Sequence, residues 1–324
     1  MPRPDLSFER TPARIRFRQT AGDANRFLNT LLVGLKTLET AAPVVPGDLV
    51  VSWSLPANES EWSDTRQFAL KGAMISLVDG LDQYMRVLSR LSGLTEPALD
   101  NALNGRKEAG EQRRPTIAER LDRLAAAHPG VARAEHLLAM HLLVMWRNRF
   151  VHHDYRFDLS RAQRQALVAA RNYFTQSHGG TDIVGALSRF DDKQAPTLAD
   201  LSTLIASAHR LVEALDMHLL HLVKARDYAM ALMRFLIFES SSPAAFIDKV
   251  WEYDSHTAVG SIHALFLDNG ANHGVNRTAS APMVSATDMI ELFSYGRNQA
   301  GAVFNVTLSK RPVPKGKRAR RSVE

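Results

Sequence analysis

Apolar residues recur at helical spacing along most of the chain between about residues 63 and 238. The clearest run alternates four and three residues apart, through Leu70, Met74, Leu77, Leu81, Tyr84, Leu88 and Leu91. This spacing places one apolar stripe along a helix, predicted over 66–92. The stripe is more typical of a core helix in a bundle than of a coiled coil with a separate partner.

Three further helices have recognisable start signals. A hydroxyl side chain that precedes an acidic or amide side chain by three residues can satisfy the first free amides of a helix. Such pairs predict helices that start near 116, 160 and 197, the second running to about 177 and the third to about 238. The pairs are Thr116 with Glu119, Ser160 with Gln163, and Thr197 with Asp200. A short helix is predicted over 183–190.

The segment 132–152 is predicted to be a helix that is apolar on nearly every face. Such a helix must be covered on more than one side. Its own bundle covers one side. The other is covered either by a second copy of the chain or by a larger core of the same chain, and the pattern leaves both open.

The two ends of the chain have a different character. Residues 1–62 contain a short amphipathic helix in 22–40 and a candidate strand, "DLVVSW", at 48–53. Residues 239–309 follow the boundary sequence "ESSSP" and contain helix signals at 243–253 and 285–296. A candidate strand, "AGAVFNVTLS" at 300–309, is a possible partner for 48–53. The predicted fold is therefore mainly α, an up-and-down helical bundle over 63–238 with N- and C-terminal α/β extensions.

The composition narrows the classes of chemistry. The chain has no cysteine, which excludes a disulfide framework, a thiol nucleophile and a thiolate metal site, and suits a reducing cytosol. The N-terminus lacks the apolar core of a signal peptide. The longest apolar stretches fall short of the roughly 20 residues that a bilayer requires. A cytoplasmic protein without a membrane segment is expected.

The net charge of +6 is concentrated in one segment. Residues 310–324 contain seven Lys or Arg and one Glu, and the rest of the chain is neutral, with 33 basic and 33 acidic residues. A disordered basic tail of this kind binds phosphate backbones without sequence preference, or is simply a solvated end. The candidate RNA-binding residues of the tail are Lys315, Lys317, Arg318, Arg320 and Arg321.

The sequence "WRNRFVHHDY" at 146–155 places a polar cluster where the apolar helix ends. Arg147 offers a permanently charged fork that suits phosphate. A histidine such as His152 exchanges protons near neutral pH. Asn148 and His152 are four residues apart and share a face. Arg147 and His152 are about 140° apart on an ideal helix, so they converge only if the helix ends between them or if a second chain shares the site.

An Arg, a polar residue directly after it, three more residues and a His at the end of an apolar helix resemble the motif of the HEPN superfamily. The resemblance covers about 63–238. It implies an all-α bundle that usually forms homodimers, in which the two Arg/His pairs line one groove. It also implies a metal-independent endoribonuclease of toxin or defence systems, with an antitoxin or regulatory partner. His152 would activate the ribose 2′-hydroxyl, Arg147 would stabilise the phosphorane, and Asn148 would position either this pair or the scissile phosphate.

Neighbours of the motif extend the predicted site. Arg149, His153 and Arg156 are candidate RNA-binding residues. His153 is either a second proton-transfer group or, as we favour, a helix cap. Some HEPN proteins carry a modified tyrosine two residues after the histidine, a position that Asp154 occupies here. The sequence therefore departs from that branch.

Two other clusters are weaker candidates. His218 and His221 lie three residues apart and with Asp216 could seat a metal, although core or surface histidines are the better interpretation. The loop "DNGANHGVNR" at 268–277, with His263 upstream, could hold an anion but lacks the end of a phosphate-binding loop. Neither a cofactor nor a metal is expected.

These observations predict a cytoplasmic endoribonuclease that cuts RNA by attack of the 2′-hydroxyl. The alternative is a non-catalytic helical module that dimerises or binds a partner through the apolar helix, with the basic tail binding nucleic acid. The division of the chain is predicted as an extension at 1–62, the HEPN-like bundle at 63–238, a mixed extension at 239–309 and the tail at 310–324.

Overall fold

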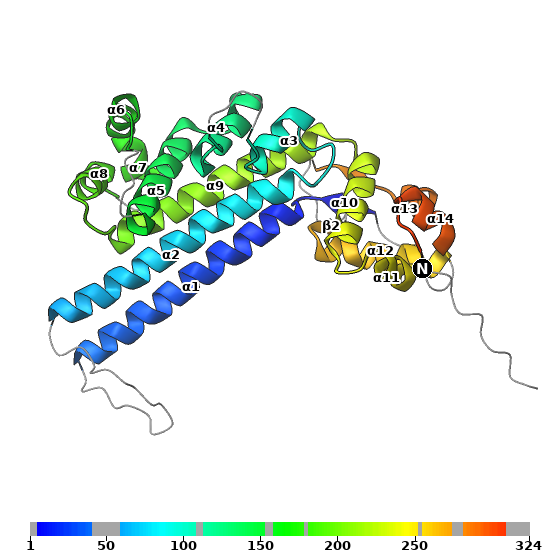
Figure 1. The fold of residues 1–324 in the computed structure, drawn as a ribbon, viewed down its shortest axis with the longest axis horizontal. Coiled ribbons are helices and arrows are strands. Elements are labelled where there is room, and N and C mark those ends of the chain that lie inside the picture. The colour runs from blue at the N-terminus through cyan, green and yellow to red at the C-terminus, as the bar shows by residue number, and fades with distance from the viewer. Residues whose placement is uncertain are drawn as a thin grey trace, which may run out of the picture.

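The computed structural model describes residues 5–40, 59–107, 113–152, 158–177, 181–251, 255–273 and 281–308. Within these ranges the chain forms helices α1 to α14 and a small sheet of three strands, so the predicted mainly α fold is confirmed. Figure 1 shows long helices packed side by side, with shorter helices at one end and a second group of elements at the other. The candidate strand at 48–53 and the basic tail lie outside the described residues.

The two longest helices, α1 (Pro12–Thr40) and α2 (Glu59–Leu88), form a helical hairpin. They approach so closely at Gly80 that a Cβ there would lie 3.3 Å from the Thr20 methyl group. Helix α1 begins ten residues earlier than the predicted 22–40. Pro12 occupies its first position, where a missing amide hydrogen costs nothing, and the Thr11 hydroxyl accepts a hydrogen bond from the Arg14 amide at 3.2 Å.

The apolar stripe of α2 lies in the core. All seven of its predicted members are buried, including Leu91 in the turns after the helix end. The bundle interpretation of this stripe is therefore confirmed, although the helix starts earlier and ends earlier than the predicted 66–92.

Helix α5 (Ala134–Val151) lies at the centre of the long helices, packed against α2, α4 (Ile117–Ala127), α6 (Arg161–Ala169) and α9 (Leu198–Leu222). Leu142, Leu143 and Trp146 are buried, and only at Val151 does a large apolar side chain of this helix become exposed. A core of the same chain therefore covers most of the apolar surface of α5. The apolar character of this helix no longer requires a second copy of the chain.

The predicted helix starts are confirmed. The hydroxyl groups of Thr116, Ser160 and Thr197 each accept a hydrogen bond from the backbone amide three residues on. The backbone amides of these three residues donate in return to the side chains of Glu119, Gln163 and Asp200. The predicted helix over 160–177 is divided at Ala170 into α6 and α7 (Arg171–Ser177). Helix α8 (Ile183–Asp191) matches its prediction, while α3 (Pro97–Leu103) precedes α4.

The pattern from 197 to 238 is also divided. Helix α9 ends at Leu222, Val223 is extended, and α10 (Ala225–Glu239) continues into the second group of elements. That group contains α11 (Pro243–Val250), α12 (Ser255–Asp268), α13 (Ala286–Phe293) and α14 (Arg297–Val303). The prediction of a strand at 300–309 is wrong over its first residues, because Arg297–Val303 is helical and buries Ala300 and Gly301.

The sheet joins the two ends of the chain. Strand β1 (Leu6–Phe8) lies between β2 (Ala271–His273) and β3 (Met283–Val284), antiparallel to both. Leu6 pairs with His273 on one side and with Val284 on the other. Gly270 has φ +104°, and a Cβ there would lie 2.0 Å from the Arg10 carbonyl oxygen. Only glycine fits this close approach.

Beside the sheet, the first turn of α1 is held by a buried carboxylate. Asp216 on α9 accepts a hydrogen bond from the Thr11 amide at 3.0 Å and a second from the Thr11 hydroxyl. Burial raises the pKa of Asp216 to about 6, although the bonds from Thr11 and the charge of Arg14 lower it. The same burial raises the pKa values of Tyr84 and Tyr228. Thr11, Tyr84, Asp216 and Tyr228 are called the Asp216 junction below.

Within the described residues, none of the helices combines the length and the apolar content needed to cross a membrane.

Candidate functional site

The end of α5 positions the predicted catalytic residues. Trp146 is buried and donates a hydrogen bond from its indole nitrogen to the Gln194 carbonyl oxygen at 2.9 Å, which fixes the last turns against the chain after α8. The helix ends at Val151. His152 has extended backbone angles, and its amide donates to the Asn148 carbonyl oxygen at 2.9 Å. The exposed His152 therefore lies just beyond the end of this largely buried helix.

Arg147 and Asn148 lie on the side of α5 that faces α2. The Asn148 side chain is buried, and its oxygen accepts a hydrogen bond from Arg147 at 3.2 Å. The Arg147 guanidinium also lies 3.5 Å from the Asp79 carboxylate on α2. Arg147 is mostly covered by protein and already has a carboxylate partner.

His152 lines a cavity of about 350 Å³ at the end of α5. Arg149 and Lys193 line the same cavity, together with Trp146, Phe150, Phe190 and Gln194. Arg147 does not line it. Helix α5 ends between Arg147 and His152, which is the condition under which these two side chains could converge within one chain. Even so, within one chain His152 shares its cavity with Arg149 and Lys193 rather than with Arg147.

Arg149 is held firmly in this cavity. Its guanidinium carbon lies 3.6 Å from the centre of the Phe190 ring, and it donates a hydrogen bond to the Phe190 carbonyl oxygen. Asp158 forms an ion pair with it at 3.0 Å. Arg149 therefore both braces the cavity and supplies a positive charge beside His152.

A larger groove of about 820 Å³ adjoins this cavity and shares Phe150, Lys193 and Gln194 with it. It lies between the α1–α2 hairpin and the chain that connects α8 to α9. Five of its lining side chains are cations: Lys36, Arg66, Lys71, Arg189 and Lys193. No carboxylate is among the described residues that line it. We call this feature the basic groove.

The cations of the basic groove differ in how they are held. Arg189 forms a two-pronged ion pair with the buried Asp200, at 2.7 and 2.9 Å. The Lys71 ammonium lies 4.7 Å from the centre of the Phe150 ring. Lys193 is exposed and has a φ of +57°, a left-handed conformation that costs a non-glycine residue roughly 1 kcal/mol. This conformation ends α8, because the Gln194 amide donates a hydrogen bond to the Arg189 carbonyl oxygen at 2.9 Å.

The structure brings together residues that the sequence did not connect. Lys36, Arg66 and Lys71 come from the hairpin, and Arg189 and Lys193 from the end of α8, more than a hundred residues away. No local signal marks them, because each is a single charged residue on an otherwise ordinary helix or turn.

Several predicted residues lie outside the described ranges. They are His153, Asp154 and Arg156 after the motif, and Lys315, Lys317, Arg318, Arg320 and Arg321 in the tail. Their predicted roles therefore stay predictions.

The residues of the two weaker candidate sites contact other residues of the fold. Asp216 is bonded to Thr11, and the His218 ring packs against the His128 ring at 5.1 Å. Among the described residues, no group of three His, Cys, Asp or Glu side chains is arranged to hold a metal ion. In the loop at 268–277, residues Ala271–His273 form β2, and the ring of the buried His263 stacks on His273 at 5.7 Å.

Comparison of the chain with protein-family models, with curated proteins and with solved structures finds no match in any of the three. The resemblance to the HEPN superfamily therefore depends on the motif and its helical setting alone.

Proposed function

We propose that the protein is a HEPN-like, metal-independent endoribonuclease in which His152 acts as the general base. The observation that supports this best is the position of His152. It is an exposed histidine at the end of a buried helix, in a cavity with two cations, which adjoins a groove whose described lining contains five cations and no carboxylate. A polyanion with reactive hydroxyl groups fits these surroundings, and RNA is such a polymer.

The proposed reaction is an internal transfer. His152 removes the proton of a ribose 2′-hydroxyl, and the 2′-oxygen forms a bond to the adjacent phosphorus while the bond to the 5′-oxygen breaks. The leaving 5′-oxygen takes a proton from the imidazolium or from water. The products are a 2′,3′-cyclic phosphate and a 5′-hydroxyl, and no redox change occurs.

The phosphorane carries negative charge that cations must stabilise. Among the described residues of one chain, Lys193 and Arg149 are the cations that line the cavity of His152. Arg147, which the motif nominates, faces Asp79 in the same chain. Arg147 would act on phosphate in a groove that two copies of the chain share, with Asn148 holding its guanidinium. Substitution of each arginine separates these two arrangements.

The test is cleavage of end-labelled RNA in EDTA by purified protein. We expect His152→Ala to lower the rate about 1,000-fold, the size typical of a lost general base. His221→Ala is the matched control, because His221 is also exposed in the last turn of a long apolar helix. Mass spectrometry of the products would detect the cyclic phosphate. Equal cleavage by all three proteins, or cleavage by none, would contradict the proposal.

The arginine variants locate the phosphate-binding cation. If Arg149→Ala and Lys193→Ala lose activity while Arg147→Ala retains it, one chain forms the site. If Arg147→Ala alone is inactive, the shared groove of a homodimer is favoured. A mixture of inactive Arg147→Ala and inactive His152→Ala chains would then regain activity only in the shared arrangement.

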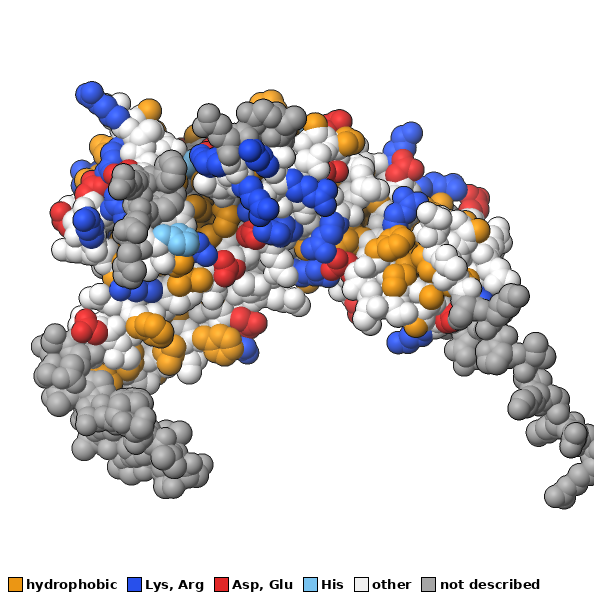
Figure 2. Space-filling view, in the orientation of Figure 1, with side chains coloured by type: hydrophobic (Ala, Val, Ile, Leu, Met, Phe, Trp, Pro, Cys, Tyr) orange, Lys and Arg blue, Asp and Glu red, His pale blue; other side chains and the backbone are white. Residues whose placement is uncertain are grey.

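The competing function, a non-catalytic module that pairs with a second copy of the chain, is favoured by a different observation. Phe27, Leu31 and Phe68 on the α1–α2 hairpin expose 57%, 53% and 78% of their surfaces. Figure 2 shows hydrophobic side chains on this hairpin. These residues, rather than α5, would form the interface. Sedimentation of the Leu31→Ser/Phe68→Ser variant tests this, with a concentration-dependent dimer expected only for the unmodified chain.

The proposed biological role, location and partners of this activity are inferred from the sequence. A toxin or defence role, a cytoplasmic location and an antitoxin or other regulatory partner are parts of the same proposal. Removal of 310–324 is expected to weaken RNA binding and flatten its salt dependence.

A further inference from the structure

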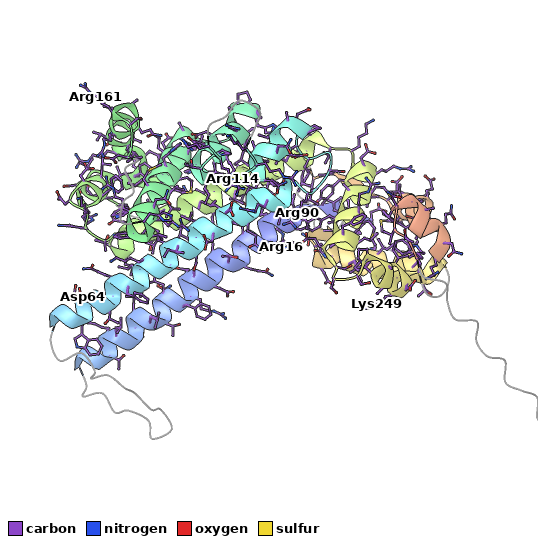
Figure 3. The ribbon with its side chains drawn as sticks, in the orientation of Figure 1. Arg16, Asp64, Arg90, Arg114, Arg161 and Lys249 are labelled. Carbon is purple, nitrogen blue, oxygen red and sulfur yellow. The ribbon has the colours of Figure 1, made fainter. Side chains whose placement is uncertain are left out.

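Basic side chains gather on the face shown in Figure 2, over the C-terminal end of α2, the start of α4 and the first turns of α1. Figure 3 labels three of them, Arg114, Arg90 and Arg16, which follow one another across this face. Arg86 and Arg113 belong to the same network of contacts, which is described below. We call Arg16, Arg86, Arg90, Arg113 and Arg114 the arginine band. None of them lines the His152 cavity or the basic groove.

Shared carboxylates hold the band together. Glu239 on α10 bridges Arg16, at 2.9 Å, and Arg90. Asp82 on α2 bridges Arg86, at 2.8 Å, and the buried Arg120 of α4. These ion pairs connect four helices.

The remaining contacts extend the network. Glu119, next to Arg120, pairs with Arg113, and the Arg90 side chain donates to the Arg86 carbonyl oxygen at 3.1 Å. Arg114 adjoins Arg113 and is exposed.

The two bridging carboxylates, Glu239 and Asp82, are less exposed than the arginines of the band that they hold. The Glu239 and Asp82 side chains are 24% and 25% exposed, whereas Arg90 and Arg86 are 46% and 50% exposed. The negative charges therefore orient the guanidinium groups from below, while the positive charges face solvent. Each guanidinium has five N–H donors, and these ion pairs use only some of them.

Such an arrangement suits phosphate. The planar fork of arginine binds phosphate oxygens in pairs, and a side chain already fixed by an ion pair loses less conformational freedom on binding. A phosphodiester backbone offers one negative charge per nucleotide, whatever the base sequence. An acidic protein would have to place several carboxylates at matching positions. The band therefore favours a nucleic acid over an acidic protein.

We propose that the arginine band binds the phosphodiester backbone of a nucleic acid, without reading its bases, at a site separate from the cavity of His152. This proposal goes beyond the proposed cleavage and does not depend on it. The band would hold a stretch of the strand away from the point of cleavage, or hold a nucleic acid that is never cut.

The test measures binding of fluorescent single-stranded and duplex RNA by anisotropy over a salt series, in full-length protein carrying His152→Ala so that the probe stays intact. The band variant is Arg86→Gln/Arg90→Gln/Arg114→Gln. Each carboxylate in this variant keeps one arginine partner, because Arg16 remains with Glu239 and Arg120 with Asp82. Thermal unfolding would confirm that the variant folds.

The control variant is Arg161→Gln/Arg171→Gln/Lys249→Gln, which removes the same charge from exposed positions outside the band. Figure 3 places Arg161 and Lys249 well away from it. We expect the band variant to bind single-stranded RNA at least tenfold more weakly. Its slope of log affinity against log salt should be shallower by about 2, the value for three lost phosphate contacts. The control variant should change far less.

Two results would overturn the proposal. One is an equal loss of affinity in the band and control variants, which would indicate net charge alone. The other is that poly-glutamate displaces the RNA probe from the unmodified band as readily as unlabelled RNA does, and that the band variant no longer binds poly-glutamate. This result would indicate an acidic protein as the partner. Failure of RNA cleavage by the unmodified chain would leave this binding result intact, so the two proposals fail separately.

Discussion

The basic groove and the Asp216 junction differ in how their charged side chains are surrounded. In the junction, a buried carboxylate is satisfied by two hydrogen bonds from Thr11 and has no access to solvent. In the groove, Lys36 and Lys193 are exposed, and the described lining contains no carboxylate. The buried carboxylate is bonded within the fold and closed to solvent, whereas the cations of the groove line a cavity that a ligand can enter.

The comparison predicts opposite results for substitutions in the two regions. Changes in the junction should alter stability and leave RNA binding unchanged. Changes in the groove should alter RNA binding with little effect on stability, or even a gain.

The largest effect on stability is expected beside the junction, for Gly270→Ala. The added Cβ would lie 2.0 Å from the Arg10 carbonyl oxygen, at a φ that disfavours any side chain. We expect the free energy of unfolding to fall by roughly 3 kcal/mol or more, measured by denaturant titration.

Gly72→Ala is the matched control, since nothing lies within 4 Å of its added Cβ and it sits inside α2. Alanine there should raise stability by about 0.5–1 kcal/mol. A neutral Gly270→Ala would show that the contact between Gly270 and Arg10 contributes little.

The next effect concerns the pH dependence of stability. The pKa of Asp216 is about 6 in the folded protein, above the 3.8 of a free carboxyl, so the folded state binds this proton more tightly than the unfolded state. Its contribution to stability is therefore full below about pH 4 and falls by about 3 kcal/mol as the pH rises past 6.

Asp216→Asn should remove this loss, because an amide can still pair with the Thr11 amide and hydroxyl. We expect the variant to be more stable than the unmodified chain at neutral pH and similar to it near pH 4, measured by unfolding across that range. Asp23→Asn, at an exposed ion pair, is the control and should leave the profile unchanged. If Asp216→Asn is less stable at neutral pH, hydrogen bonding to the carboxylate outweighs the cost of its burial.

The smallest effect is expected in the groove, for Lys193→Gly. Glycine adopts a φ of +57° without strain at this position after α8, so stability should rise by about 1 kcal/mol while RNA affinity falls severalfold. Lys193→Arg keeps the charge and should change neither. A fall in stability for the glycine variant would mean that the lysine side chain supports the fold.

Sequence reasoning succeeded where structure depends on neighbours along the chain. The cap formed by Thr116 and Glu119 needs only residues of one helix turn, and its pattern was sufficient to place the start of α4. The stripe from Leu70 to Leu91 was likewise sufficient to identify the buried face of α2, because helical periodicity alone determines which residues align.

Sequence reasoning failed where the residues that contact one another are far apart in the sequence. Strand β1 was not predicted, since its three residues form a strand only between β2 and β3, more than 260 residues away. The end of α9 at Leu222 has neither glycine nor proline to mark it. The same holds for the candidate site: the motif identified His152 and Arg149, but Lys193 joined them only through the packing of α8 against α5.

The position of β1 has a consequence for synthesis of the protein. Leu6 and Phe8 are synthesised more than 260 residues before the strands that pair with them, Ala271–His273 and Met283–Val284. At roughly 5–20 residues per second, their partners follow on the order of 15 to 50 seconds later. During that interval the apolar segment Leu6–Phe8 of the growing chain lacks its partner strands. A chaperone that recognises short apolar segments would therefore have a target at Leu6–Phe8 of the nascent chain.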